Sequence, residues 1–266
     1  MSLSLNPVDD DQAFLSARRL CHDFGTVPIL DGIEIDVRKN EFLSILGPSG
    51  CGKSTLLQIL AGLVKPSSGE IVLARKPVTG PPRDLIYLFQ DYSKSLFPWL
   101  TVLANVEFAL DGRRAGTRAQ RLEWCRENIA RVGLNGFEQH YPWQLSGGMQ
   151  QRVAIARALA AEPQVLLMDE PFGAVDALTR IELQSLIHRI WLDTGLTVIL
   201  ITHDVDEAVF LAQRVVMLSR RPSRVARTVD VTLSKVRHPV STREEPQFLA
   251  LRRSLLDAML SGKALS

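Results

Sequence analysis

Cysteine is scarce in this 266-residue chain, and its three positions exclude two common uses of the residue. Cys21, Cys51 and Cys125 are an odd number, and none of them belongs to a CxxC pair. Structural zinc sites and disulfide frameworks need cysteines at recognisable spacings. The sequence therefore indicates neither of them, and it favours a reducing compartment.

An excess of charge of one sign is missing as well. The chain has 31 basic and 29 acidic residues, which nearly cancel. Nucleic-acid-binding domains usually carry a clear basic excess, so this balance argues against a nucleic-acid partner. One basic stretch holds Arg220, Arg221, Arg224 and Arg227, and we interpret it as a solvated loop.

Long apolar runs are also absent. The longest, such as residues 196–201, fall far short of the ~18 residues that span a bilayer. The first thirty residues are polar and acidic, without the positive segment and apolar core of a signal peptide. We therefore expect a chain that does not cross a membrane by itself.

Short apolar runs alternate with helical patterns along most of the chain. Residues 42–46, 165–168 and 197–202 read as buried strands, and helix-forming stretches lie between them. Alternating strands and helices predict an α/β fold with a mainly parallel sheet. Between residues 91 and 159, helix formers without a strand pattern interrupt this alternation.

The interruption divides the chain into three parts. We expect an α/β core from residues 1–90 and 160–235, a helical subdomain from 91–159 and a C-terminal helical tail from 236–266. One helical face of the tail carries Phe248, Leu251, Leu255 and Met259. This spacing predicts a helix that packs against the core.

A glycine-rich motif follows the strand at residues 42–46 and opens a helix. It matches G-x-x-x-x-G-K-[ST] and consists of Gly47, Pro48, Ser49, Gly50, Cys51, Gly52, Lys53 and Ser54. Glycines let backbone N–H groups converge on phosphate oxygens, and the helix N-terminus adds its positive dipole end. Lys53 would reach the β- and γ-phosphates of ATP, and the Ser54 hydroxyl would ligate Mg²⁺. Ser49 and Thr55 are expected as further phosphate contacts, and Cys51 as a small residue that fits the loop.

Two acids and a histidine follow later strands. Asp169 and Glu170 end the apolar run that begins at residue 165, and His203 ends the run at 197–202. The carboxyl ends of parallel strands form the ligand-binding edge of an open α/β sheet. We expect Asp169 to hold Mg²⁺, Glu170 to accept a proton from the attacking water and His203 to contact the γ-phosphate or orient that water. The alternatives are an Asp-Glu pair that caps the next turn and a structural histidine.

A second helix end suited to anions lies at Ser146, Gly147 and Gly148. Serine is a good N-cap, and glycines allow an anion to approach the free N–H groups of the following helix. Two such ends and one phosphate loop in a single chain are most simply explained if two copies meet head to tail. The sequence therefore predicts a homodimer with ATP between the copies.

The stretch Leu145-Ser146-Gly147-Gly148-Met149-Gln150-Gln151-Arg152, with the phosphate loop and the acidic strand end, resembles the nucleotide-binding subunit of ATP-binding cassette (ABC) transporters. The resemblance covers residues 13–220. It implies a P-loop NTPase core with a mainly parallel sheet, an N-terminal antiparallel β part and an inserted α-helical subdomain. It also implies that Ser146, Gly147 and Gly148 close over ATP held by the opposite protomer.

Three further positions resemble functional residues of this family. Gln90 is similar to the glutamine that binds ATP, senses Mg²⁺ and couples to the membrane subunits. Asp176, in Gly173-Ala174-Val175-Asp176, is similar to the dimer-contact aspartate, although the family more often has Ser-Ala-Leu-Asp there. Phe24 falls where many relatives stack a tyrosine on adenine, and its alternative is a place in the core.

A narrower resemblance comes from Phe89-Gln90-Asp91-Tyr92, from Leu96-Phe97-Pro98-Trp99-Leu100-Thr101-Val102 and from the turn Arg221-Pro222-Ser223-Arg224-Val225. These are similar to the nitrate/sulfonate/taurine importer branch. The resemblance implies a peripheral ATPase on the cytoplasmic face of the bacterial inner membrane. Its permease would dock near residues 91–106 and would receive solute from an external binding protein. The alternative is that Pro98 and Trp99 only fix a loop.

The sequence therefore predicts an ATP- and Mg²⁺-dependent ATPase that powers an ABC importer of small anions. One alternative is a soluble, non-transport cassette ATPase acting on nucleic acid or ribosomes, although such proteins usually carry a long coiled coil or two cassettes. A binding switch with negligible turnover and a kinase are two others. Glu170 and His203 argue against the switch, and the motif at residues 145–152 has no role in a kinase.

Overall fold

The computed structural model describes residues 13–91, 95–110, 116–173 and 175–261. The expectation about a signal peptide concerns residues 1–12 in part, and these lie outside the described residues, as do Tyr92 and Ala174 of the quoted motifs. Within the described ranges, no helix is long and apolar enough to cross a membrane.

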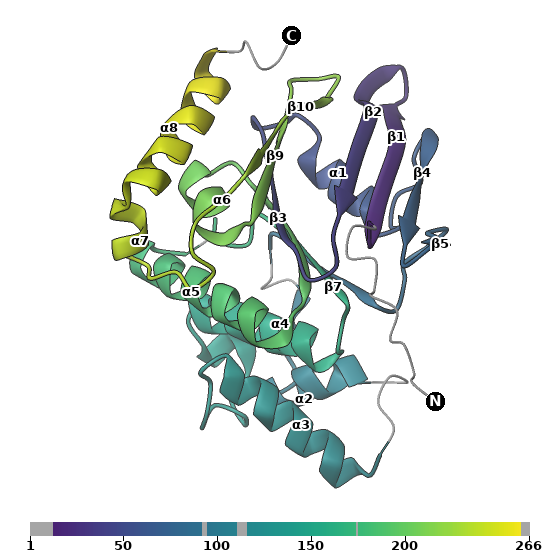
Figure 1. Cartoon of the computed structure of the whole chain (residues 1–266). Helices are drawn as coiled ribbons and strands as arrows, with labels where there is room; N and C mark the ends of the chain where they lie inside the picture. The colour runs from purple at the N-terminus through teal and green to yellow at the C-terminus, as the bar shows by residue number, and fades with distance from the viewer. Residues whose placement is uncertain (1–12, 92–94, 111–115, 174, 262–266) are drawn as a thin grey trace, which may run out of the picture.

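An antiparallel sheet of four strands forms near the N-terminus, with the strand order β2-β1-β4-β5 (Figure 1). Its strands are β1 (Leu15–Phe24), β2 (Val27–Val37), β4 (Ser68–Leu73) and β5 (Lys76–Pro77). In β2, Ile33, Ile35 and Val37 are buried while the residues between them are exposed. Buried and exposed residues therefore alternate along this strand, and this sheet is the antiparallel part that the resemblance implies.

The second sheet has six strands in the order β10-β9-β3-β8-β7-β6. Its strands are β3 (Phe42–Leu46), β6 (Leu85–Leu88), β7 (Val165–Asp169), β8 (Thr197–Thr202), β9 (Arg214–Leu218) and β10 (Val225–Asp230). All neighbours pair in parallel except β10, which runs antiparallel to β9. Every residue of β3, β7 and β8 is buried, as expected for strands covered on both faces.

Helices cover both faces of this parallel sheet. They are α1 (Lys53–Leu60), α2 (Val102–Glu107), α3 (Arg118–Arg131), α4 (Gly147–Ala160), α5 (Ala177–Thr194), α6 (Val205–Leu211), α7 (Ser241–Glu244) and α8 (Pro246–Ser261). Helix α1 belongs to a buried cluster between the two sheets. Helices α2 to α6 and α8 contribute to a second cluster, which covers the opposite face of the parallel sheet. The predicted α/β fold is confirmed.

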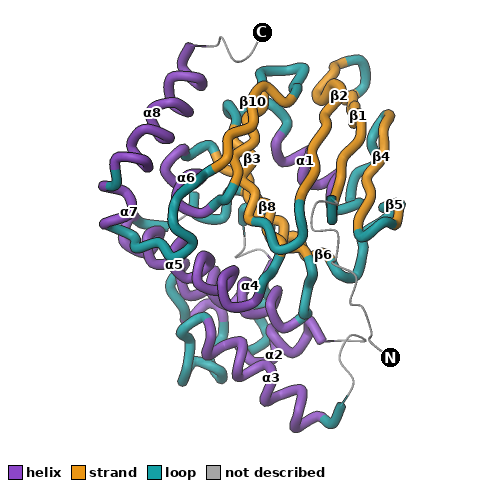
Figure 2. Tube along the Cα trace, viewed as in Figure 1, coloured by secondary structure: helices purple, strands orange, loops and turns teal. Residues whose placement is uncertain are grey.

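The helical insertion gathers at one end of the molecule, where α2, α3 and α4 lie together away from the antiparallel sheet (Figure 2). Helix α4 packs against α2 and α3 and also contacts α5 and β6. The 3₁₀ turns η2 (Phe108–Leu110) and η3 (Pro142–Gln144) complete this part of the chain. Helix α4, which begins within the motif at residues 145–152, therefore connects the insertion to the sheet.

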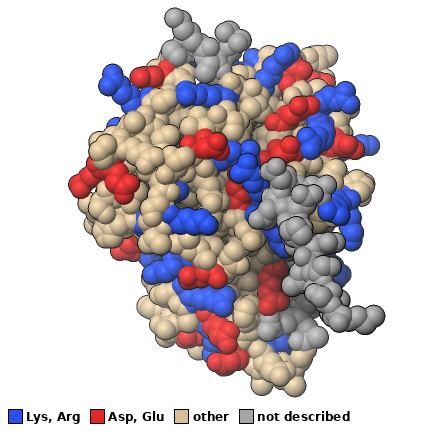
Figure 3. Space-filling model, in the orientation of Figure 1, with Lys and Arg blue, Asp and Glu red and all other residues tan. Residues whose placement is uncertain are grey.

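At the C-terminal end, α8 packs against α6 and buries Phe248 and Leu255, as the spacing predicts. The four arginines of the basic stretch are exposed, as expected, but Arg227 lies in strand β10 and not in a loop. Arg224 also pairs with Asp31 of β2 at the surface. On the face drawn in Figure 3, positive and negative side chains of the described residues are interspersed.

Candidate functional site

The phosphate loop connects the end of β3 to the start of α1. Gly50 and Gly52 have φ angles of 76° and 108°, which favour glycine. A Cβ atom on Gly52 would lie 2.7 Å from Cγ2 of Ile29, so a larger residue would also collide with β2. The helix begins at Lys53 directly after this turn, and its first N–H groups therefore face the loop.

Lys53 is 5% exposed and is held inside the loop. Its Nζ donates hydrogen bonds to the carbonyl oxygens of Gly47 at 3.0 Å and Pro48 at 3.1 Å. The same Nζ lies 3.7 Å from Oε1 of Glu170. The amine therefore stands between the loop and the acidic end of β7, where it can meet an anion.

Asp169 is the last residue of β7 and receives two hydrogen bonds. The Ser54 hydroxyl donates to its Oδ1 at 3.0 Å, and the Tyr87 hydroxyl donates to its Oδ2 at 2.9 Å. Burial raises the pKa of the Asp169 carboxyl, and these two hydrogen bonds partly oppose that shift. Burial and the neighbouring carboxylate raise the pKa of the Tyr87 phenol. The site thus holds a carboxylate whose two oxygens face polar hydrogens.

Glu170 follows in the left-handed region, with φ at 43°, and its N–H donates to the carbonyl of Ile201 at 3.0 Å. Because β7 and β8 are parallel neighbours with Asp169 opposite Ile201, their ends bring Glu170 and His203 together. His203 Nδ1 lies 3.0 Å from Glu170 Oε2. A non-glycine residue at this φ is strained, and such strain is common at functional sites.

Cys51 fills space under the loop. Its side chain is buried, and a Cβ atom on Gly47 would lie 3.1 Å from its sulfur. The Ser223 hydroxyl donates to the Cys51 carbonyl oxygen, so the turn after β9 also supports the loop. Burial raises the pKa of the thiol. This geometry agrees with the interpretation of Cys51 as a small residue that fits. Ser49 and Ser54 are exposed, and Thr55 is half-buried.

Gln90 and Phe24 lie at the ends of other strands. Leu88 pairs with Met168 in the β6–β7 register, so Gln90, two residues further, comes level with Glu170. Phe24 is 73% exposed, which excludes the alternative of a core residue. It pairs with Val27, two residues before the Ile29 that touches Gly52. The strand register therefore places Phe24 at the turn between β1 and β2, next to the part of β2 that leads to Ile29.

The second expected anion-binding site lies where the N-termini of α4 and α5 meet. Ser146 caps α4, and its hydroxyl accepts a hydrogen bond from the N–H of Met149 at 3.3 Å. Asp176 caps α5, and a bond from the Thr179 hydroxyl lowers the pKa of this carboxyl. A Cβ atom on Gly148 would lie 2.4 Å from Cγ2 of Thr179, so the two starts touch.

In the contacts described, no hydrogen bond or ion pair joins this pair of helix starts to the phosphate loop. Ser146, Gly147 and Asp176 are exposed. Helix α4 packs mainly against α2 and α3. The structure therefore groups the candidate residues into two sets, one around Lys53 and one around Ser146.

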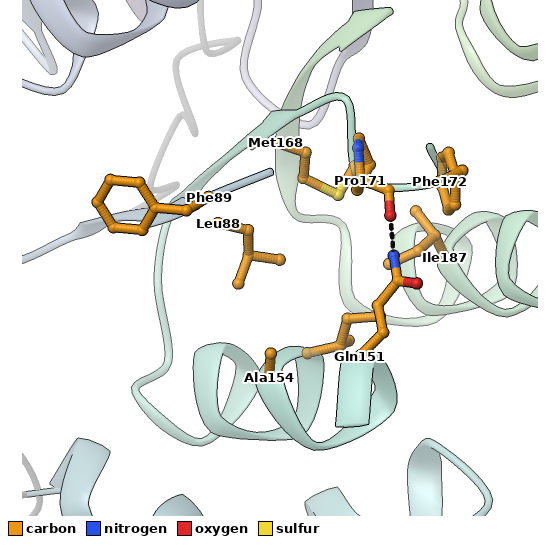
Figure 4. A pocket seen from close by; sticks show the side chains of 9 residues that line it. Leu88, Phe89, Gln151, Ala154, Met168, Pro171, Phe172 and Ile187 are labelled. Carbon is orange, nitrogen blue, oxygen red and sulfur yellow. Dashed lines mark hydrogen bonds between the residues drawn. The ribbon is translucent and has the colours of Figure 1, made fainter. Parts of the chain in front are cut away.

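Gln151 connects helix α4 to the segment that follows β7, as Figure 4 shows. It is 2% exposed, and its amide donates to the carbonyl oxygen of Pro171, the residue after Glu170. Apolar side chains surround this contact, among them Met168, Phe172 and Ile187 (Figure 4). Sequence reasoning quoted Gln151 within the motif but gave it no role, and it passed over Tyr87. Tyr87 could have been considered from the sequence, because it is a polar aromatic residue in the strand that leads to Gln90.

Comparisons with known proteins agree with this geometry. A family model described as ABC transporter matches residues 30–173. An uncharacterised ABC transporter ATP-binding protein of Methanocaldococcus jannaschii is 48% identical over 233 residues, which cover 88% of this chain and 85% of the relative. The taurine import ATP-binding protein TauB of Escherichia coli O157:H7 is 45% identical over 254 residues, which cover 94% of this chain and 98% of the relative.

Solved structures agree as well. A bacterial ABC transporter cassette solved as a dimer matches with a TM-score of 0.73 and 33% identity, covering 83% of this chain and 100% of that one. The same cassette has been solved as a dimer in a post-hydrolysis state bound to ADP and Pi, and that structure matches with a TM-score of 0.72, 32% identity and the same coverage.

Proposed function

The chain belongs to the ABC transporter family as an ATP-binding subunit that hydrolyses ATP, and on this premise we propose that it drives uptake of a small anion of the nitrate, sulfonate or taurine type through a separate permease. One observation carries the proposal: Glu170 lies within 3.7 Å of Lys53 and within 3.0 Å of His203 at one sheet edge. The similarity to TauB supports the class of solute.

The proposed nucleotide site follows the phosphate loop. The chain's own contacts to ATP are Phe24, Gly47, Pro48, Ser49, Gly50, Cys51, Gly52, Lys53, Ser54, Thr55 and Gln90. The loop's N–H groups and the N-terminus of α1 bind the phosphate oxygens. Lys53 turns from its carbonyl partners to the β- and γ-phosphates, because a charge-assisted bond is stronger than one to a neutral carbonyl.

The proposed Mg²⁺ ligands are Ser54, Asp169 and Gln90. Ser54 Oγ and Asp169 Oδ1 are already 3.0 Å apart, so these oxygens converge on one point. Hydroxyl, carboxylate and amide oxygens are hard donors of the kind Mg²⁺ prefers. Phosphate oxygens and water would supply the remaining ligands of the ion. When bound, Mg²⁺ offsets the negative charge of the phosphate oxygens.

Hydrolysis uses the residues that follow β7 and β8. Glu170 accepts a proton from the water that attacks the γ-phosphate. His203 holds the carboxylate through its Nδ1 contact of 3.0 Å, and it directs its other ring nitrogen away from Glu170. Lys53 offsets charge on the transferred phosphoryl group. The three side chains thus divide proton transfer, orientation and charge stabilisation among them.

The proposed active form is a head-to-tail homodimer. Ser146, Gly147 and Asp176 are exposed at the starts of α4 and α5, and Gly148 is buried against Thr179. In the dimer these residues would close over ATP bound by the partner, and the N-terminus of α4 would face the γ-phosphate. The dimeric form of the similar cassette supports this arrangement.

A groove near the helical insertion is the proposed docking site for the permease. It has a volume of about 630 Å³ and is lined by Phe89, Ser95, Phe97, Phe108 and Arg157, among others. Arg157 donates to the backbone carbonyl and the hydroxyl of Ser95, at 2.6 and 2.8 Å. Trp99 is 70% exposed, which suits a protein contact. We place the permease helix near residues 91–106, of which 92–94 lie outside the described part.

Further parts of the assembly follow from this role. The subunit lies peripherally on the cytoplasmic face of the bacterial inner membrane, and an external solute-binding protein delivers the solute to the permease. Residues 1–90 and 160–235 serve as the ATP-binding core, 91–159 as the helical subdomain that meets the permease and 236–266 as a helical tail.

Capture from membranes tests the proposed function. The tagged full chain, purified from detergent-solubilised membranes of its own cells, is expected to bring down a multi-span membrane protein. Phe108→Asp places a charge in the apolar groove and is expected to abolish this capture, while ATP binding by the purified chain stays unchanged. Recovery of ribosomes or nucleic acid in place of a membrane protein would support the non-transport alternative and contradict the proposal.

Phe24→Ala tests the adenine contact. Removal of the ring is expected to raise the KM for ATP about tenfold with little change in kcat, because base–aromatic stacking contributes on the order of 1–3 kcal/mol. Phe24→Tyr keeps the ring and serves as the matched control. Steady-state ATPase kinetics on both variants measure the effect, and an unchanged KM in Phe24→Ala would remove Phe24 from the site.

A further inference from the structure

A buried chain of hydrogen bonds runs from the C-terminal tail to the residue before His203. Arg243 of α7 donates through Nη2 to Oε1 of Gln184 at 2.6 Å. Gln184 donates through Nε2 to Oε1 of Glu207 at 3.1 Å, and the Thr202 hydroxyl donates to Oε2 of Glu207 at 2.6 Å. Gln184, Glu207 and Thr202 are 2%, 6% and 1% exposed, so water does not compete for these bonds.

Donors and acceptors match along this series of hydrogen bonds. Arg243 carries donors alone, so Gln184 must turn its oxygen to the guanidinium and its NH₂ to Glu207. The Thr202 oxygen accepts from the N–H of Asp204 at 2.9 Å, and its proton is donated to Oε2 of Glu207. A buried network that is satisfied in this way holds its members rigidly.

The network closes around the backbone of His203. Thr202 and Asp204 flank the histidine and are bonded to each other across it. The Asp204 carboxylate also accepts from the N–H groups of Asp206 and Glu207, at 2.8 and 3.2 Å, which fixes the start of α6. The His203 side chain is 56% exposed, so its position toward Glu170 depends on the backbone that carries it.

The tail contributes to this network through the packing of Arg243 and through its charge. Arg243 lies over the ring of Phe210, with its Cζ 4.2 Å from the ring centroid, and burial lowers the pKa of its guanidinium. Burial also raises the pKa of the Glu207 carboxyl, and the bonds from Thr202 and Gln184 oppose that shift. The Arg243 guanidinium and the buried Glu207 carboxyl are therefore joined through the side-chain amide of Gln184.

We propose that Glu207 is a positioning residue for ATP hydrolysis, which holds the His203 backbone through Thr202, and that Arg243 completes this support from the C-terminal tail through Gln184. The inference rests on the proposed role of His203 in hydrolysis. Glu207 touches neither nucleotide nor water in this scheme. Its loss would misplace His203 by a small distance and would slow the chemical step, while ATP binding on the phosphate loop would remain.

Paired substitutions at Thr202 test the inference. Thr202→Val keeps the shape but removes the hydroxyl, and it is expected to lower kcat about tenfold with KM for ATP changed by less than about twofold. Thr202→Ser restores the hydroxyl and is expected to restore most of kcat. Glu207→Gln should match Thr202→Val, and the double variant should lose little more than either single one because both act in one network.

Tail variants extend the test if the buried substitutions prevent folding. Arg243→Gln removes the charge that faces Gln184, and it is expected to lower kcat at least about threefold without raising KM. Arg252→Gln breaks the exposed pair between the tail and Asp206 and is the matched control, with kcat unchanged. Thermal unfolding and ADP binding, followed on every variant, separate loss of folded protein from loss of turnover.

The outcomes separate the two proposals. A wild-type chain without ATPase activity would overturn the proposed function. An active wild type whose Thr202→Val and Arg243→Gln variants keep wild-type kcat, or lose only thermal stability, would overturn the positioning role of Glu207 alone. A rise in KM at constant kcat would overturn it as well.

Discussion

Glu170→Gln is expected to lower kcat for ATP hydrolysis at least about 100-fold while ATP binding persists, because general-base catalysis contributes on the order of 10²–10⁴. The amide has the size of the carboxylate and can still contact His203, so the site keeps its shape. It also removes a negative charge 3.7 Å from Lys53, which frees the amine for the phosphates. ATP should therefore hold the variant as a dimer that does not turn over.

Two measurements check this result. Steady-state ATPase assays give kcat, and size-exclusion chromatography with MgATP shows whether the dimer accumulates. Glu123→Gln is the matched control, since it removes a carboxylate that is 66% exposed on α3 and pairs only with Arg126 at 3.4 Å in the contacts described. Near-normal turnover of Glu170→Gln would show that Glu170 is not the catalytic base.

The residues at the ends of β7 and β8 could be placed from the sequence. Asp169, Glu170 and His203 each follow a fully buried apolar run, and parallel strands end at one edge. The phosphate loop could be predicted equally well, because its motif fixes both the turn and the start of α1. These predictions needed only local pattern and one rule about open sheets.

Strand β1 shows why some strands were harder to predict from the sequence. Its pairing with β2 shifts between Ala17 and Leu20, and Arg19 has a φ of 45°, which is the geometry of a β-bulge. The bulge breaks the alternation of buried and exposed residues on which strand prediction depends. Strand β10 is an edge strand without a buried residue, so it has no apolar run and its arginine appeared to belong to a loop.

The supporting residues of the site needed tertiary structure. Tyr87 reaches Asp169 only because β6 pairs with β7 in a particular register. Gln151 meets Pro171 across two elements 20 positions apart in the chain, and Arg243 meets Gln184 across 59 positions. Sequence spacing carries no sign of such contacts. The positions of the candidate site residues at the strand ends were thus predictable, whereas the contacts that hold them in place were not.

Ser146→Phe is expected to lower ATPase activity at least about 100-fold and to prevent ATP-dependent dimer formation, while the single chain still binds ATP. Removal of one group that stabilises transition-state charge costs on the order of 10²–10³ in rate, and the bulky ring would also block the approach of the partner. The substitution also removes the N-cap of α4, which costs on the order of 1 kcal/mol. Thr117→Ala removes the N-cap of α3 and controls for that loss.

A mixing experiment then decides which chain supplies Ser146. Lys53→Ala and Ser146→Ala should each lose most of their activity, since one lacks the phosphate-binding amine and the other the serine hydroxyl of the second helix end. The mixing experiment uses Ser146→Ala because the ring of Ser146→Phe would also hinder formation of a mixed dimer. In a head-to-tail heterodimer, one site pairs the intact Lys53 of the second variant with the intact Ser146 of the first. Mixing the two proteins is therefore expected to restore part of the activity. If both groups served the same chain's nucleotide, every chain in the mixture would remain defective, and no activity would return.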